Sequence, residues 1–103
     1  MVEAPLAAAL IAAGRTILRQ VRCPAGQIDI WDATNNRLFE CKARGSSGSV
    51  ADAASQLRRY APHYPGAQLI IAVPRIEPEA LWLADLLEAN GFVFLEIEAG
   101  SEI

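Results

Sequence analysis

The segment Gln68–Pro74 reads Gln-Leu-Ile-Ile-Ala-Val-Pro and is apolar without interruption from position 69 to position 73. Uninterrupted apolar runs of this length are typical of strands that are buried on both faces, because side chains on both sides of the strand then lie in a core. Strand-like and helix-like segments alternate after residue 50. The run therefore indicates a buried strand in an α/β sheet.

The other elements follow from apolar spacing and from turn residues. Helices are predicted over 2–13, over 50–60 with Ser49 as N-cap, and over 78–90; further strands are predicted over 16–22, 27–32, 39–43 and 92–97. Three antiparallel strands followed by a crossover helix and a parallel strand give a mixed β-sheet with an αβββαβ core. A C-terminal helix and strand extend this core, and we expect a single domain over residues 1–103.

Composition excludes several classes of protein. The chain has 103 residues, of which 52% are hydrophobic and 20% are charged, values that are typical of globular domains. The apolar run 6–13 has no basic segment before it and is far shorter than a membrane span, so we expect a cytoplasmic protein without a membrane partner. Its two cysteines, Cys23 and Cys41, are too few for a disulfide framework and are expected to be reduced thiols.

One face of the predicted hairpin gathers charged side chains. A two-residue turn at Asn35-Asn36 would place Asp29 opposite Lys42 and diagonal to Glu40. Because side chains alternate along a strand, these three residues would then share a face. Two carboxylates and one ammonium group on so small a patch are more than an ordinary solvated surface needs.

These residues carry a resemblance to a known family. Gly26-x-Ile28-Asp29, a hairpin and then Glu40-x-Lys42 resemble the signature of the PD-(D/E)xK nuclease superfamily, which includes restriction endonucleases and archaeal-type Holliday-junction resolvases. Two further features match: Glu3 at the start of the first helix and Gln56-Leu57-x-x-Tyr60 in the helix after the third strand. The resemblance covers residues 3–74 and lies in the order and spacing of the motifs. Ile28, rather than proline, precedes the aspartate.

The resemblance implies a restriction endonuclease-like fold and a divalent-metal-dependent nuclease that hydrolyses phosphodiester bonds, with DNA as the expected partner. Mg²⁺ or Mn²⁺ would be the cofactor, held by Asp29, Glu40 and the main-chain carbonyl of Cys41. Lys42 would orient or help to deprotonate the attacking water. Glu3 and Gln56 would complete the catalytic set, although Glu3 also suits a helix N-terminus and Gln56 also suits the polar edge of an amphipathic helix.

Charge is distributed unevenly along the chain. Residues 1–75 contain nine basic and five acidic residues, a balance of +4, whereas residues 76–103 contain seven acidic residues and no basic one. A basic surround allows a phosphate to approach carboxylates that would otherwise repel it. The predicted nucleic-acid contacts lie at or next to a flexible loop at 45–49 and on the helix that follows: Arg44, Ser46, Ser47, Arg58 and Arg59. The composition of the loop would equally suit a linker without a function.

Two alternatives remain open. One alternative to a nuclease is a catalytically inactive nuclease-fold module that binds nucleic acid or protein. The other is an interaction domain in which the charged patch is a salt-bridge network. A homodimer is also expected, because a domain this small would grip a duplex better as a pair. Its contact surface would include Trp82, Phe92 and Phe94 from the last helix and strand.

Overall fold

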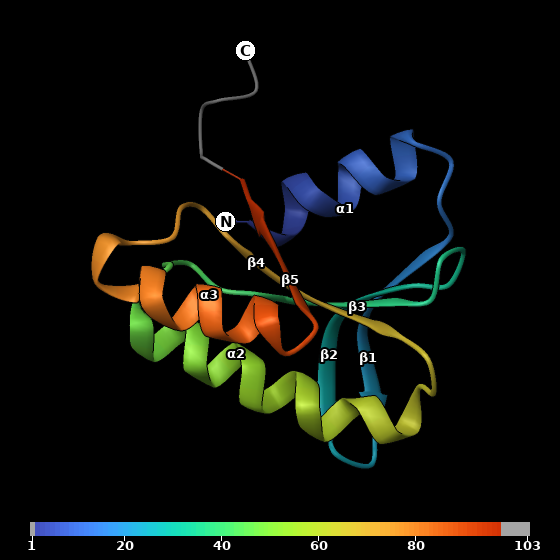
Figure 1. Cartoon of the computed structure of the whole chain (residues 1–103). Coiled ribbons are helices and arrows are strands. Elements are labelled where there is room, and N and C mark those ends of the chain that lie inside the picture. Colours follow the sequence, from blue (N-terminus) through green and yellow to red (C-terminus); the bar gives the residue numbers. More distant parts are fainter. Residues whose placement is uncertain (1, 98–103) are drawn as a thin grey trace.

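The computed structural model describes residues 2–97, which form a five-stranded mixed sheet with helices on both faces (Figure 1). The strands lie in the sheet in the order of the sequence: β1 (Ile17–Cys23), β2 (Gly26–Asp32), β3 (Arg37–Cys41), β4 (Gln68–Val73) and β5 (Phe92–Glu96). The first three strands are antiparallel to one another, and β3, β4 and β5 are parallel. The predicted mixed sheet and element order are confirmed.

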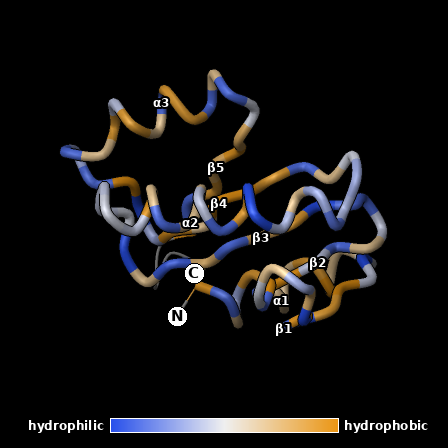
Figure 2. The backbone as a smooth tube through the Cα atoms, turned by 90° about the horizontal axis from the view of Figure 1, so that it is seen from below, coloured by the Kyte–Doolittle hydropathy of each residue, from blue (hydrophilic) through white to orange (hydrophobic). Residues whose placement is uncertain are grey.

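The helices form two outer layers, with α1 (Glu3–Ala12) on one face of the sheet and α2 (Ser47–Tyr60) and α3 (Leu81–Ala89) on the other (Figures 1 and 2). A short 3₁₀ turn, Ala61–His63, follows α2, and another, Pro78–Ala80, leads into α3. Among residues 2–97, no helix is long and apolar enough to cross a membrane.

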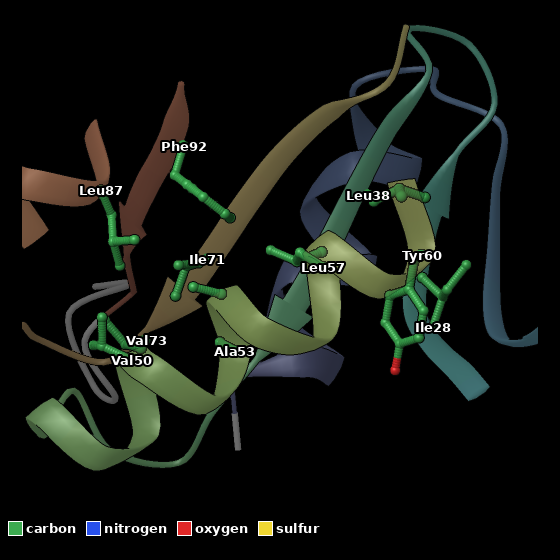
Figure 3. Packing of buried hydrophobic residues seen from close by; sticks show 11 residues of the cluster. Ile28, Leu38, Val50, Ala53, Leu57, Tyr60, Ile71, Val73, Leu87 and Phe92 are labelled. Atoms are coloured by element: carbon green, nitrogen blue, oxygen red, sulfur yellow. The ribbon is translucent and has the colours of Figure 1, made fainter. Parts of the chain in front are cut away.

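Strand β4 is buried on both faces, as its apolar run predicts. Ile71 and Val73 lie in the cluster on the α2 side, where Val50 and Leu57 of α2 pack against the sheet (Figure 3). Ile70 and Ala72, which alternate with them, lie in the cluster under α1. The sheet therefore separates two cores, and each of the two helical layers covers one of them.

The predicted register of the β2–β3 hairpin is wrong by two residues. Asp32 pairs with Arg37, so residues 33–36 form a four-residue connection instead of a two-residue turn. The cause is Asp32, which is fully buried, accepts hydrogen bonds from the Thr34 and Asn35 amides and forms a 2.6 Å ion pair with Arg37. A shift of two residues leaves every side chain on the same face, because side chains alternate with a period of two.

The segment 45–49, predicted to be a flexible loop, is instead ordered by two contacts. Ser46 caps α2 by accepting a hydrogen bond from the Ser49 amide, so the helix begins at Ser47 and not at residue 50. Gly45 forms a parallel bridge with Ile76, and a Cβ atom at Gly45 would lie only 2.0 Å from the Arg75 carbonyl oxygen. Only glycine fits there.

The surface proposed for self-association is partly buried. Phe92 is 5% exposed and belongs to the core cluster on the α2 side, and Phe94 packs against that cluster. The prediction that Phe92 belongs to a contact surface is therefore wrong. Trp82 and Leu86, four residues apart on α3, remain 64% and 52% exposed.

Candidate active site

Asp29 and Glu40 meet at the point where β2 and β3 separate. The hairpin register pairs Ile30 with Phe39, and its continuation brings Asp29 opposite Glu40 rather than opposite Lys42. Asp29 Oδ2 accepts a 2.8 Å hydrogen bond from the Cys41 amide, which ties this carboxylate to the strand that carries Glu40. Burial raises the pKa of Asp29, and the Cys41 amide partly offsets that effect.

Glu40 is a buried acid that lacks a full set of partners. The residue is 4% exposed, and its Oε1 atom has no hydrogen-bond partner. Burial, together with the negative charge of Asp29, raises the pKa of Glu40 to about 8. An ionised carboxylate in such a place requires a nearby cation, because burying an uncompensated charge is costly.

Lys42 is held between two acids. Its Nζ atom lies 4.0 Å from Glu40 Oε2 and 2.6 Å from Asp52 Oδ2. Asp52 belongs to α2 and was not among the predicted site residues. A signal was present in the sequence, because Asp52 precedes Gln56 by four residues and so lies on the same flank of the helix.

The Gln56 side chain also has a buried oxygen without a hydrogen-bond partner. Among residues 2–97, the buried side-chain polar atoms without a hydrogen-bond partner are Glu40 Oε1 and Gln56 Oε1. At the end of the same helix, the Tyr60 hydroxyl donates a 2.9 Å hydrogen bond to the Gln27 carbonyl, which fixes α2 against β2. Each of these two acceptors, both on predicted site residues, needs a hydrogen-bond donor or a cation.

Glu3 lies at the edge of this group. Its carboxylate accepts 2.9 Å hydrogen bonds from Arg19 Nε and from Gln20 Nε2, both on β1. Its negative charge nevertheless contributes to the raised pKa values of Asp29 and Glu40. Glu3 is therefore close enough to the two carboxylates to act on them electrostatically, although its direct partners are on β1.

The residues predicted to contact nucleic acid are largely engaged within the chain. Arg44 forms a bidentate pair with Glu77, with distances of 2.8 and 3.0 Å, and the Ser47 amide and hydroxyl donate to Glu79. Ser46 caps α2. On that helix the Arg58 guanidinium lies 5.1 Å from the centre of the Phe92 ring, whereas Arg59 is exposed and donates to Ser55.

The donor atoms fit a hard cation better than a soft one. Within residues 2–97 there is no group of three or more histidine, cysteine, aspartate or glutamate side chains that could hold a metal ion. Two carboxylates and a main-chain carbonyl would still offer oxygen ligands, which suit Mg²⁺ with several waters retained. Burial, with the charge of Asp29, raises the pKa of the Cys41 thiol to about 12, so this sulfur stays protonated and is a poor ligand.

Solved structures share this fold. A repair endonuclease from Pyrococcus abyssi matches with a TM-score of 0.68 and 19% identity over 95% of this chain, and EndoMS in a complex with dsDNA matches with 0.66 and 21% over 94%. The chain spans 47% and 44% of those proteins. No protein-family profile matches the sequence, and no curated protein matches it. The two structures confirm the predicted restriction endonuclease-like fold.

Proposed function

We propose that this chain is a divalent-metal-dependent nuclease that hydrolyses phosphodiester bonds in DNA. The fold supports a nuclease, because both similar structures have it, one being named a repair endonuclease and the other bound to dsDNA. Since the same fold can host different activities, the weight of the proposal rests on the site and not on the fold.

The observation that carries the proposal is the state of Glu40. Its carboxyl group is buried, lies beside Asp29 on the neighbouring strand and has one oxygen without a partner. Two acids forced together in this way repel each other when ionised, and a shared divalent cation removes that repulsion. A purely structural salt bridge would instead satisfy both oxygens.

The proposed roles follow from these positions. Asp29, Glu40 and the Cys41 carbonyl would hold Mg²⁺ or Mn²⁺, which when bound would supply the Lewis acid that polarises the scissile phosphate. Lys42, 4.0 Å from Glu40, would donate a hydrogen bond from Nζ to orient the attacking water. Gln56 Oε1 would accept a hydrogen bond from water in the same site.

A second candidate is the inactive nuclease-fold module that binds nucleic acid or protein without cutting. One observation favours it: Lys42 Nζ forms a 2.6 Å ion pair with Asp52, so its ammonium group already has an anionic partner. In this case the fold would be retained while the residues of the site serve only binding.

Cleavage assays distinguish the two candidates. Purified protein should be incubated with Mn²⁺ or Mg²⁺ and single-stranded, duplex, nicked or four-way-junction DNA, with structured RNA as a further substrate. We expect metal-dependent cleavage that EDTA abolishes. Asp29→Ala and Glu40→Ala should remove most of the rate, and Lys42→Ala should slow cleavage about 10²–10⁴-fold.

Asp85→Ala is the matched control, because Asp85 is an exposed acid on α3, away from the site. It should cleave at the wild-type rate. If no substrate is cut with either metal while the carboxylate variants bind nucleic acid as well as wild type, the nuclease proposal fails and the binding module replaces it.

A further inference from the structure

Strand β2 reverses the faces of its side chains at Asp29. Residues two apart in a strand normally share a face. Ile28 nevertheless packs in the core on the α2 side, whereas Ile30 packs in the core under α1. The strand therefore turns over between these two residues, and Asp29 is the residue at which it does so.

Strand β1 turns over at the same level. Val21 packs against the core on the α2 side and Ile17 against the core under α1, although their spacing would place both on one face. The ladder pairs Arg19 with Ile30 and Val21 with Ile28, which places Gln20 directly opposite Asp29. Both strands of the ribbon thus reverse at the Gln20–Asp29 position.

The backbone of Gln20 explains how the ribbon can reverse. Gln20 has a φ of +54°, in the left-handed region that residues with a Cβ atom rarely occupy. The pairing on either side keeps the same register, so the reversal comes from this conformation and not from an inserted residue. A left-handed glutamine at a site of proposed chemistry is an observed outlier of the kind that clusters at functional positions.

The carboxamide of Gln20 links the other groups around Asp29. Its nitrogen donates to both oxygens of Glu3 at 2.9 Å, and its oxygen accepts from Gln27 Nε2 at 2.9 Å. One side chain thus connects α1, β1 and β2 at the acidic side of the candidate site.

We propose that Gln20 is a positioning residue that holds Glu3 beside Asp29 at the edge of the candidate metal site. This inference rests on the proposed function. Asp29 already faces Glu40 through the β2–β3 register, Gln20 lies opposite Asp29 in the β1–β2 ladder, and the Gln20 carboxamide holds Glu3 near this pair by donating to both of its oxygens. Groups that orient metal ligands typically change metal affinity about 10–100-fold when they are removed.

Calorimetric titration with MnCl₂ tests the role, with thermal unfolding of the metal-free proteins in parallel. Gln20→Gly relieves the strain of the left-handed backbone but also removes the exposed hydrogen bonds of the carboxamide, and these effects oppose each other, so its Tm should stay close to that of wild type. Its Kd for Mn²⁺ should rise about 10–100-fold. Gln20→Met, similar in size but without hydrogen bonds, should also bind Mn²⁺ more weakly.

Arg22→Gly is the matched control. Arg22 is exposed on the same strand and belongs to the regular ladder opposite Gln27, so glycine there should lower the Tm and leave the Kd for Mn²⁺ within about twofold of wild type. Saturating Mn²⁺ should restore cleavage by Gln20→Gly but not by Glu40→Gln.

The outcomes separate this inference from the proposed function. If wild type binds Mn²⁺ and Gln20→Gly binds it equally well, Gln20 has no positioning role and the nuclease proposal stands. A Tm loss in Gln20→Gly without a change in Kd assigns Gln20 to folding alone and overturns the inference. A wild-type protein that binds no Mn²⁺ overturns both proposals.

Discussion

Replacing Glu40 with glutamine should stabilise the metal-free protein at alkaline pH. Burial and the charge of Asp29 raise the pKa of Glu40 from 4.5 to about 8, so between these values the folded state binds more protons than the unfolded state. Stability must then fall as the pH rises through this range. Glutamine has the shape of protonated glutamate and does not titrate, so the variant should lose this pH dependence.

The size of the effect follows from the pKa. A change from 4.5 to about 8 corresponds to roughly 5 kcal/mol at 1.36 kcal/mol per pKa unit. The ionised side chain can relax toward water, so we expect Glu40→Gln to exceed wild type by about 2–4 kcal/mol at pH 9. Lys42 is not orphaned by the change, because Asp52 remains 2.6 Å away.

Urea unfolding in EDTA at pH 5, 7 and 9, followed by tryptophan fluorescence, measures the effect. Glu88→Gln, which changes an exposed acid on α3, is the control and should show no gain at any pH. Adding Mn²⁺ should stabilise wild type more than Glu40→Gln. If Glu40→Gln is less stable than wild type at all three pH values, Glu40 is a structural partner of Lys42 and the reasoning is refuted.

Four further results are expected. Asp52→Asn should lower the pH at which Mn²⁺ begins to bind, because the charge of Asp52 contributes to the raised pKa of Glu40. If Mn²⁺ affinity measured against pH has the same midpoint in Asp52→Asn as in wild type, this expectation is wrong. Asp32→Ala should lower the free energy of unfolding in urea by about 3–5 kcal/mol, because it removes the buried carboxylate that pairs with Arg37. A loss below about 1 kcal/mol would contradict this expectation. Arg59→Ala should weaken DNA binding and flatten the salt dependence of binding without changing the Tm. Arg58→Ala should also lower the Tm, because it removes the contact of the guanidinium with the Phe92 ring. Equal salt slopes in wild type and Arg59→Ala would exclude a phosphate contact by Arg59. Light scattering should show a dimer for wild type and a monomer for Trp82→Ser, and a monomeric wild type would refute self-association through α3.

Patterns spread over many residues predicted the fold well. The apolar run of β4, the three preceding strand-like segments and the helix breakers determine the element order, and the structure has that order. Strands and helices are specified by repeated apolar spacing, so a single misjudged residue does not change the result. Boundaries depend on single caps, which is why α2 begins three residues early at Ser47.

The hairpin register depended on one buried acid. The pair Asn35-Asn36 favours a two-residue turn, but Asp32 binds the Thr34 and Asn35 amides and Arg37, and these contacts select a four-residue connection. Local turn preferences are weaker than a buried, charge-assisted network. The error was two residues and therefore preserved the face, which is why Asp29 and Glu40 still come together.

The reversal of side-chain faces in strands β1 and β2 could not be predicted from the sequence. Left-handed backbone is expected at glycine and asparagine, and nothing in the sequence around Gln20 singles it out for that conformation. Asp52 is a different case, since its spacing from Gln56 placed it on the correct flank of α2. The pairing with Lys42 required the position of β3 beneath that helix, which only the packed structure supplies.

A crystal structure grown with Mn²⁺, with anomalous data collected at the manganese edge, tests the central claim most directly. We predict one strong anomalous peak bound by a carboxylate oxygen of Asp29, Glu40 Oε1 and the Cys41 main-chain carbonyl, at distances of about 2.0–2.3 Å. The peak should vanish in Asp29→Asn. The claim would be contradicted if the Asp29 and Glu40 side chains were well ordered and no anomalous peak lay between them. The Mn²⁺ concentration must be high enough for manganese to appear at other positions on the protein.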